Sequence, residues 1–496
     1  MAVEREIKLE VPSQAWDEVL AALGGAGGKP MRLQAVYQDT EDAALARAGA
    51  ALRVRLEGDR WVQTLKFRDG GAMHRIEDEH VVGSARRSRA APQADLDLHR
   101  AEGLPARLRA ALGLGPDEAW PRLRPVFEVR VQRRLLEVSH QGSRIELALD
   151  EGAVQAGERS MAVRELEFEL LEGRWSDVLR LARAWCERHE LWISVASKAQ
   201  RGWQLARGEA SEGAVHAHAP SLPDEPTPQG FASAVLSACL EQVLANAGEV
   251  AAGSGGDDHV HQLRVGLRRL RTALRELPVL QPARRSLEPA LVTAFRALGE
   301  RRDRTHVLAR IQPLLEAEGV PAVEWPDGFS ASGAAATRAV RAPPFQLALF
   351  DLLLLAERLR PGGGNRLKRE LRQALQRLHR QVLRDGRRFT KLDAARQHRV
   401  RKRLKRLRYL SEFAAPLFDE ARARDFLAAL EPAQDALGDF NDEVIAQHLY
   451  EELAQADPAA RQGVRRLRER REGGAKASRR VLRALQDARP FWTRRD

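Results

Sequence analysis

The 496-residue sequence predicts an α+β N-terminal domain, a closed antiparallel β-barrel with covering helices, followed by an all-α helical bundle with an internal duplication. The first observation is length, because a chain of this size exceeds what one hydrophobic core usually serves. The second is that short segments up to about residue 205 alternate apolar and polar residues, as strands do. The third is that nearly everything from about residue 230 onward has helical spacing.

A segment without periodicity separates the two halves. Gly208 to Gln229 is rich in Ser, Gly, Pro and Ala, which is the composition of a semi-rigid linker. We therefore expect a first domain at residues 1–205, a linker at 206–228 and a helical domain at 229–490.

Charge and cysteine content narrow the class of protein. The formal net charge is +12 and the pI is about 10.3, which favours a polyanionic partner. Only two cysteines occur, far apart in sequence, so neither a disulfide framework nor a cysteine metal site is indicated. The first ten residues are charged, and no run approaches the roughly 20 apolar residues of a membrane span. We expect a cytoplasmic protein without a membrane partner.

The strand candidates of the first half share a face that carries charge. Because side chains alternate between the two faces of a strand, each of the following sets lies on one face. The sets are Glu4, Glu6 and Lys8; Arg53 and Arg55; Thr64 and Lys66; and Glu165, Glu167 and Glu169. One interpretation is an ordinary half-buried sheet whose charged faces meet solvent.

Two amphipathic helical segments favour a different interpretation. Ser13 to Leu23 and Ser176 to Trp185 each carry an apolar stripe that must cover an apolar surface. If these helices pack outside the sheet, the charged faces point inward. A closed barrel follows, and a lumen lined by acids and bases is costly unless it holds ions and an anion.

At this point the sequence resembles a known family. The strand Glu4-Arg5-Glu6-Ile7-Lys8 matches the Glu-x-Glu-x-Lys signature of the CYTH domain, also called the triphosphate tunnel metalloenzyme fold. Further elements follow in family order: Tyr37-Gln38-Asp39-Thr40, Leu52-Arg53-Val54-Arg55, Thr64-Leu65-Lys66, Arg75-Ile76-Glu77, Leu149-Asp150-Glu151-Gly152, Glu165-Leu166-Glu167-Phe168-Glu169-Leu170 and Ser197-Lys198-Ala199-Gln200-Arg201-Gly202. The resemblance covers the whole first half.

The resemblance implies a metal-dependent triphosphatase site. Carboxylates on two facing strands would hold Mg²⁺ or Mn²⁺, since both are hard cations that prefer oxygen ligands. The candidate metal ligands are Glu4, Glu6, Glu165, Glu167 and Glu169, and the two or three of the last trio that bind metal cannot be selected from spacing. One metal would hold the substrate and a second, more weakly held, would lower the pKa of the attacking water.

Basic residues would bind the phosphate chain of the substrate. The candidates are Arg53, Arg55, Lys66, Lys198 and either Arg130 or Arg133, because arginine forks bind phosphate oxygens bidentately. The candidate catalytic residues are Glu4, Glu6, Lys8, Lys66 and Asp150. Asp150 would position water or merely orient an arginine.

The helical half contains an internal repeat. Aligning His261 with His398 aligns basic residues at offsets of three, seven and ten, which form one helical stripe. The stripes comprise Arg264, Arg268 and Arg271 in one copy and Arg401, Lys405 and Arg408 in the other. Downstream, Leu298-Gly299 corresponds to Leu437-Gly438.

These features resemble the CHAD domain, a helical module that binds polyphosphate. The resemblance implies that His261, His398 and the two stripes line one basic surface that binds without chemistry. The order of domains is similar to that of bacterial two-domain inorganic triphosphatases. It implies hydrolysis of inorganic triphosphate to pyrophosphate and phosphate, in a cytoplasm where polyphosphate granules could be a site of association.

Other functions remain open from sequence. The chain could be a non-catalytic polyphosphate-binding protein, or the site could act on thiamine triphosphate, a nucleoside triphosphate or an RNA end, or cyclise ATP. A nucleic-acid binder is disfavoured, because aromatic residues are only 5% of the chain and the basic stripes lack interleaved aromatics.

Overall fold

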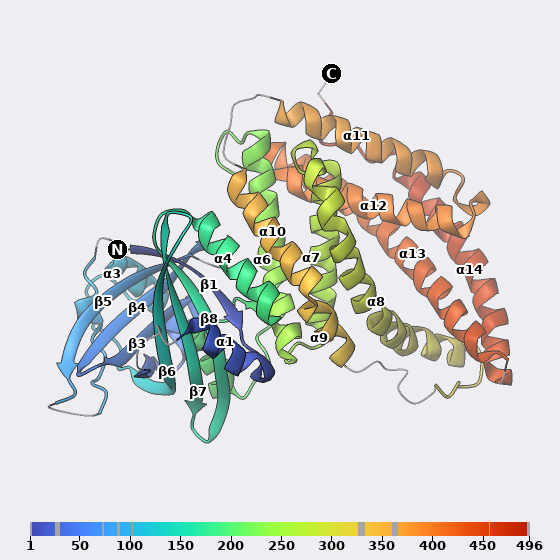
Figure 1. Ribbon diagram of the computed structural model, residues 1–496. Coiled ribbons are helices and arrows are strands. Elements are labelled where there is room, and N and C mark those ends of the chain that lie inside the picture. The colour runs from blue at the N-terminus through green and yellow to red at the C-terminus, as the bar shows by residue number, and fades with distance from the viewer. Residues whose placement is uncertain are drawn as a thin grey trace. The chain divides into compact units, whose positions relative to one another are not determined.

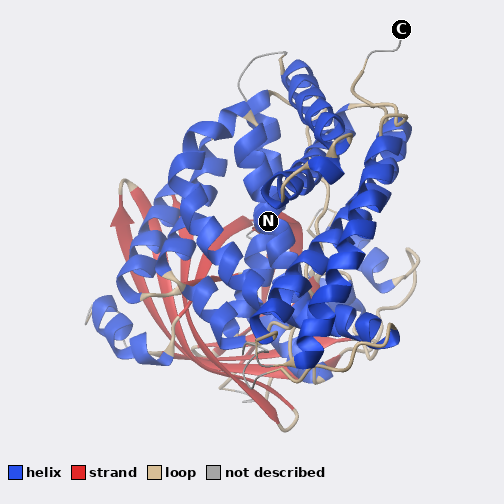
Figure 2. Ribbon diagram, turned by 90° about the vertical axis from the view of Figure 1, so that its right-hand side faces the viewer, coloured by secondary structure: helices blue, strands red, loops and turns tan. Residues whose placement is uncertain are grey.

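The computed structural model describes residues 2–24, 30–71, 74–86, 90–101, 103–325, 333–359, 366–455 and 457–493 (Figure 1). The chain divides into two compact units. The first comprises Met1–Val215, Leu244–His259 and Arg341–Leu354, and the second comprises His216–Val243, Val260–Val340 and Leu355–Asp496. The strands, red in Figure 2, all belong to the first unit, and the second is helical as predicted.

The first unit is built around nine strands. They are β1 (Ala2–Glu10), β2 (Met31–Asp39), β3 (Ala50–Glu57), β4 (Arg60–Gly71), β5 (His74–Ser84), β6 (Arg124–His140), β7 (Ser143–Ala156), β8 (Arg159–Glu172) and β9 (Trp192–Ser194). Its helices are α1 (Trp16–Leu23), α2 (Ala44–Arg47), α3 (Leu104–Leu112), α4 (Trp175–His189) and α5 (Lys198–Arg207), with short 3₁₀ turns η1 (Ser13–Ala15) and η2 (Leu96–Leu98).

The strands form one antiparallel sheet, and the predicted closed barrel is wrong. The hydrogen-bonded order is β5-β4-β3-β2-β6-β7-β8-β1-β9, an open sheet with β5 and β9 at its ends. β1 also meets β5, through Ala2 to Arg5, whereas it pairs with β8 through Glu6 to Glu10. In the described strands no β1 residue is paired with both β5 and β8. A repeat of two determines which face a side chain occupies, but it does not determine whether the end strands join.

The two faces of the sheet differ as the alternation predicted. On one face, Ile7 and Leu9 of β1 and Leu166 and Phe168 of β8 are almost fully buried. Helix α4 covers these strands with its own apolar stripe, which includes Val178. The charged residues of the same strands therefore face the other way, into the concave side of the sheet.

Helix α5 lies on that concave side, against β6, β7 and β8. Ser197 caps its first turn, and Gln200 completes the reciprocal capping box. The helix approaches β6 very closely at Gly202, where an added Cβ would lie 2.1 Å from the Phe127 ring. The glycine thus allows the close approach that brings Lys198 into the sheet's concave side.

Two stretches from the helical half of the sequence belong to the first unit. The side chain of Gln346 accepts a hydrogen bond of 3.0 Å from the backbone N–H of Ile193, and Arg183 donates to Asp351 at 2.9 Å. The Arg341 guanidinium stacks 3.9 Å from the centroid of the Trp192 ring. These polar contacts attach residues 341–354 to β9 and α4, so experiments on the first unit call for the full-length chain. The domain boundaries at residues 205 and 229 stay predictions.

The helices that follow the linker are α6 (Pro228–Ala252), α7 (Asp257–Glu276), α8 (Gln281–Ala317), α9 (Gly333–Arg341), α10 (Pro343–Arg358), α11 (Leu367–Gly386), α12 (Ala394–Ala414), α13 (Glu420–Leu453) and α14 (Pro458–Ala484). Short 3₁₀ turns are η3 (Pro278–Leu280), η4 (Phe389–Lys391) and η5 (Ala415–Leu417). The internal repeat is visible in this order: α7, η3 and the long α8 correspond to α12, η5 and the long α13.

By length and composition, α6 is apolar enough to cross a membrane, and α9 with α10 would be a second candidate if the bent pair counted as one span. In the structure, 67% of the most apolar part of α6 is buried. Burial of this kind is typical of a core helix that packs on its neighbours.

Candidate functional site

The concave side of the sheet encloses a cavity of about 520 Å³ whose lining is charged. Strands β1 to β8 and helix α5 all contribute to it. The acidic lining residues are Glu6, Glu77, Glu79, Glu146, Asp150, Glu167, Glu169 and Glu212, and the basic ones are Lys8, Arg47, Arg53, Arg55, Lys66, Arg133, Lys198 and Arg207. The cavity therefore gathers most of the residues that the sequence singled out.

Three carboxylates meet at one end of this cavity. Potential ligand oxygens of Asp150, Glu165 and Glu167 lie within 4.8 Å of one another. Their positions follow from strand register, since Asp150 on β7 pairs with Glu165 on β8, and Glu167 stands two residues further along β8. We refer to these three residues as the acidic cluster.

Three cations neutralise the acidic cluster. Lys198 Nζ lies 2.7 Å from Asp150 and 3.0 Å from Glu167 and also pairs with Glu165. Arg133 donates two hydrogen bonds to Asp150, at 2.8 and 2.7 Å, and one to Glu167 at 2.6 Å. Lys8 lies 3.4 Å from Glu167.

Burial raises the pKa values of the three carboxylates of the cluster, whereas the neighbouring cations lower them. Burial opposes ionisation of Glu167, but Lys198, Arg133 and Lys8 outweigh it and hold the pKa of Glu167 well below its usual range. For Glu165, burial dominates and raises the pKa. The pKa of Lys198 stays well above its usual value, because the attraction of Asp150, Glu165 and Glu167 exceeds the cost of burying the ammonium group.

The acidic cluster fits a hard divalent cation. All its donors are carboxylate oxygens, and the buried Glu165 Oε2 accepts no hydrogen bond, although the Arg201 guanidinium lies 3.5 Å from it. A cation held here would share the carboxylates with the Lys198 ammonium group. The donor set suits Mg²⁺ and Mn²⁺ equally.

Three further predicted phosphate-binding residues, Arg53, Arg55 and Lys66, also line the cavity. Lys66 lies 3.0 Å from Glu77, Arg53 lies 3.6 Å from the same carboxylate, and Arg55 pairs with Glu57 and lies 3.9 Å from Glu79. In these pairs each cation contacts one or two carboxylates. An anion entering the cavity would thus meet three cations from β3 and β4.

The structure distinguishes Arg130 from Arg133, between which the sequence could not choose. Arg133 lines the cavity, whereas the Arg130 side chain is 59% exposed and pairs with Glu128 at 2.7 Å. Arg133 is therefore the substrate-binding candidate of the two.

The acidic strands are not arranged as expected. β1 and β8 are hydrogen-bonded neighbours, not facing strands, and Glu6 is directly paired with Glu169. Both residues line the cavity. Glu165 belongs to the acidic cluster, but it is fully buried behind the lining. The side chain of Glu4, also a predicted ligand, lies outside the described residues.

One residue of the cavity lining and one ion pair beside the acidic cluster were not foreseen. Glu146 lines it from β7, on the same face as Asp150, so the alternation Glu146, Ala148, Asp150 was an available signal. Arg201 pairs with Glu10 and lies 3.5 Å from Glu165. Glu10 continues the alternation of Glu6 and Lys8 by one more step.

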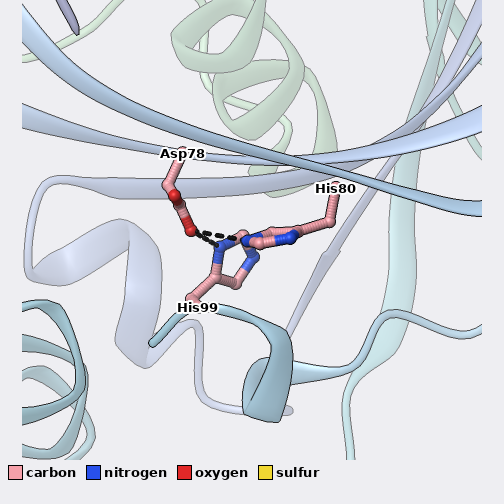
Figure 3. Close-up of side chains that lie close together, drawn as sticks. All are labelled: Asp78, His80 and His99. Carbon is pink, nitrogen blue, oxygen red and sulfur yellow. Dashed lines mark hydrogen bonds and ion pairs between the residues drawn. The ribbon is translucent and has the colours of Figure 1, made fainter. Parts of the chain in front are cut away.

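A second group of potential metal ligands lies on the other face of β5 (Figure 3). Asp78 Oδ2 is 2.6 Å from His99 Nδ1 and 2.9 Å from His80 Nε2. The Gln63 amide is fixed by the backbone of Asp95, and its Nε2 lies 2.9 Å from His99 Nε2. Because the Gln63 amide nitrogen donates to Nε2 of His99, this nitrogen is the unprotonated acceptor, and Nδ1 carries the proton that it donates to Asp78. These hydrogen bonds satisfy both ring nitrogens of His99 without a metal.

The predicted basic stripe of α7 gathers around one aromatic ring. The guanidinium carbons of Arg264, Arg268 and Arg271 lie 4.6, 5.9 and 5.7 Å from the centroid of Phe295 on α8. Arg268 also donates to the Tyr409 hydroxyl of α12 at 3.3 Å. The two repeats therefore meet at this point.

Beside this ring lies a cluster of cations, which we call the Lys402 cluster: Arg271, Arg275, Arg296, Lys402 and Arg406. Burial and the other four cations lower the pKa of Lys402. Glu288 pairs with Arg271 and Arg275, and Glu276 pairs with Arg406. The positive charge around Lys402 favours an anionic ligand.

The remaining residues of the predicted surface lie on the same two helices. His261 is on α7, and Arg401, Lys405 and His398 are on α12. Arg408 contacts Glu412 at 2.7 Å and Gln434 at 2.8 Å. Partial burial, Lys402 and Arg401 lower the pKa of His398, so any gain of affinity from its protonation would begin below the ordinary histidine range.

Comparison with known proteins agrees with both resemblances. Residues 2–203 match the family model of the CYTH domain, and residues 234–451 match that of the CHAD domain. An inorganic triphosphatase of Haemophilus influenzae is 32% identical over 211 residues, which are 41% of this chain and 55% of that relative. The match thus spans about half of the relative's length.

Two solved structures are also similar. The CHAD domain from the plant Ricinus communis shares 29% identity, with 57% of this chain and 99% of that one covered and a TM-score of 0.47. A Hippeastrum protein described as a putative adenylyl cyclase with a dominant triphosphatase activity shares 22% identity, with 42% and 96% covered and a TM-score of 0.31.

Proposed function

Since residues 2–203 form a CYTH domain and residues 234–451 a CHAD domain, we propose that this chain hydrolyses inorganic triphosphate to pyrophosphate and phosphate in a metal-dependent reaction. The observation that carries the proposal is the cavity, in which the acidic cluster and a separate set of three cations line one space. The similarity to a protein named inorganic triphosphatase supports the choice of substrate.

In this proposal the chain's own residues bind and orient the phosphate chain. Arg53, Arg55 and Lys66 donate hydrogen bonds to its oxygens and neutralise charge that would otherwise repel the attacking water. Lys8, Arg133 and Lys198 hold Glu167 ionised and in place, and Arg133 and Lys198 do the same for Asp150. A Mg²⁺ or Mn²⁺ ion held by Asp150, Glu165 and Glu167 would supply Lewis-acid polarisation of phosphate oxygens.

A substrate panel tests the proposal on the full-length chain. With Mg²⁺ or Mn²⁺ present, we expect kcat/KM for inorganic triphosphate to exceed that for ATP and thiamine triphosphate by at least about tenfold. A gap of this size corresponds to about 1.4 kcal/mol of differential transition-state binding. A preference for ATP or thiamine triphosphate would contradict the proposed substrate, and the absence of any turnover would favour a non-catalytic polyphosphate-binding protein.

The second unit supports a second proposed function, the binding of inorganic polyphosphate. The favouring observation is the Lys402 cluster, together with the three arginines around Phe295. Arg264 is only 6% exposed and donates to the Phe295 carbonyl oxygen at 3.3 Å, so it would support the ring. Successive phosphates of a flexible chain could contact the half-buried Arg268 and Arg271 and the Lys402 cluster. Nucleic acid is the less favoured partner, and neither a membrane partner nor a polyphosphate-granule location is needed for this proposal. The cytoplasmic location also stays a proposal, with which two free, buried cysteines are compatible.

A further inference from the structure

Part of the cavity wall comes from the segment that the sequence predicts as a linker. Glu212, in this segment, lines the cavity together with Arg207, the last residue of α5. The chain around Glu212 forms neither helix nor strand, yet it belongs to the first unit. Its position at the cavity therefore depends on side chains that hold its backbone.

Two buried side chains hold this segment. The fully buried Asn246 amide accepts a hydrogen bond from the Val215 N–H at 3.2 Å and donates one to the Val215 carbonyl oxygen at 2.9 Å. The Gly256 N–H donates to Nδ1 of the buried His259, so Nε2 carries the proton, which it donates to the Glu212 carbonyl oxygen at 2.8 Å. The backbone of Glu212 is thus fixed, which limits where its carboxylate can lie.

The cavity extends past the phosphate-binding cations toward the connection between β2 and β3. Beside the acidic cluster, Arg133 is paired with Met31 of β2, and six residues further along β2, Tyr37 is paired with Arg53. β2 ends two residues later, and Arg47 of α2, in the connection to β3, also lines the cavity. This end of the cavity thus lies on the far side of Arg53 from the acidic cluster.

Glu212 lies at the same end. Arg159, at the start of β8, donates to the carbonyl oxygen of Leu205 in the last turn of α5 at 2.6 Å. The start of β8 is paired with the end of β7, and the end of β7 is paired with the part of β6 that lies beside the end of β2. The last turn of α5 therefore lies near the end of β2, and its Arg207 is 3.7 Å from the Glu212 carboxylate.

The guanidinium groups of this end are already paired with carboxylates. Arg47 lies 2.5 Å from Asp42, and Arg207 lies 2.9 Å from Glu209. Asp42 and Glu209 are outside the cavity lining, whereas Glu212 is part of it. An anion that reaches this end thus meets a negative charge beside two neutralised cations, and like charges repel.

The opposite end of the cavity is acidic as well. Glu146 and Glu169 line it and are directly paired on β7 and β8, four residues along β7 from Asp150. A phosphate chain that occupies the space between the acidic cluster and the three cations would therefore approach carboxylates if it extended in either direction.

We infer that Glu212 is a specificity-determining residue whose charge repels a fourth phosphate, so that the cavity favours inorganic triphosphate over tetraphosphate and longer chains. This inference rests on the proposed triphosphatase function. Such selectivity would leave intact the long polyphosphate that is the proposed ligand of the second unit.

A competition assay on the full-length chain tests the inference. Inorganic triphosphate and tetraphosphate are supplied together at equal concentration with Mg²⁺, and ion chromatography follows the initial loss of each, which gives the ratio of their kcat/KM values. Glu212→Gln nearly keeps the size of the side chain and removes its charge. It should raise the ratio of tetraphosphate to triphosphate about tenfold, the order expected for one partly screened unit charge at close range. Glu212→Asp retains the charge and should keep a ratio near that of wild type.

Glu209→Gln is the matched control. Glu209 carries the same charge and contacts the same arginine, but it is outside the cavity lining, so its replacement should leave the ratio unchanged. Ionic strength provides a second readout. Because dissolved ions screen partly exposed charges, the difference in ratio between wild type and Glu212→Gln should shrink as salt is added.

The outcomes separate this inference from the proposed function. Equal ratios in Glu212→Gln and Glu209→Gln, with wild type active on triphosphate, would overturn the inference and leave the proposed function standing. A difference that persists unchanged at high salt would assign the effect to packing instead of charge and would also overturn it. The absence of turnover of both substrates by wild type would refute the proposed function, and the inference with it.

Discussion

Replacing Glu167 by glutamine is expected to lower the rate of triphosphate hydrolysis by about 1,000-fold. Glu167 contacts Lys8, Arg133 and Lys198 and also belongs to the acidic cluster. The amide is a much weaker ligand for a divalent cation and leaves the three cations with one negative charge fewer. A loss of this size, about 4 kcal/mol of barrier, is within the range for removing a group that stabilises developing charge.

Glu172→Gln is the matched control for this change. Glu172 is on the same strand, is 71% exposed at its side chain and lies 3.4 Å from Arg144. We expect the control to keep activity within about twofold, and Mn²⁺ affinity, measured by calorimetry, to fall only in Glu167→Gln. Circular dichroism should be unchanged in both. Nearly full activity of a folded Glu167→Gln protein would remove Glu167 from the metal site.

The second large effect concerns polyphosphate. Changing both Arg264 and Arg268 to alanine in the full-length chain should weaken binding of long-chain polyphosphate by about 100-fold at low salt. Hydrogen bonds to charged groups contribute about 1.5–3 kcal/mol each. The change would remove the direct contact of Arg268 and the support that the buried Arg264 gives to Phe295 and the arginines around it. The slope of log Kd against log salt should also become shallower, because fewer counterions are released.

Two controls separate this site from net charge and from folding. Changing the exposed Arg479 and Arg480 of α14 to alanine removes the same charge elsewhere and should weaken binding much less. At Gly299 an added Cβ would lie 2.1 Å from Arg264 Nη1, whereas at Gly438, its counterpart in the repeat, nothing lies within 4 Å. Gly299→Ala should therefore weaken binding, and Gly438→Ala should not. Equal loss in the two arginine double variants, or displacement of polyphosphate by DNA at equal charge, would contradict the proposed surface.

Much of the first unit could be predicted from the spacing of its residues. Alternation placed Glu6, Lys8, Lys66 and Glu167 on one face of their strands, and the structure has all four in the cavity lining. However, alternation only determines which face of its own strand each side chain occupies. The neighbour relation of β1 and β8 and the open order of the sheet depend on pairing between distant segments, which no single-strand pattern encodes.

The choice between Arg130 and Arg133 shows the same limit. The two residues are three apart on β6, so they lie on opposite faces, and only the neighbours β2 and β7 determine which face is concave. Glu146 could have been found, since it shares its face with Asp150.

In the second unit, the repeat predicted two basic helices, but it did not predict which cationic side chains lie close together. Lys402 lies outside the aligned stripe, four residues after His398, yet α7 and α8 bring Arg271, Arg275 and Arg296 around it. Packing between helices, which the pattern of one helix does not contain, thus produces the most cation-rich part of the proposed surface.

The most direct test of the central claim is phosphate release from inorganic triphosphate by the full-length chain, measured with Mg²⁺, with Mn²⁺ and with excess chelator. The acidic cluster predicts turnover with either metal and none above background in chelator, with activity restored when the metal is added back. Undiminished hydrolysis in chelator, or no hydrolysis with either metal, would contradict a metal-dependent triphosphatase site in this cavity.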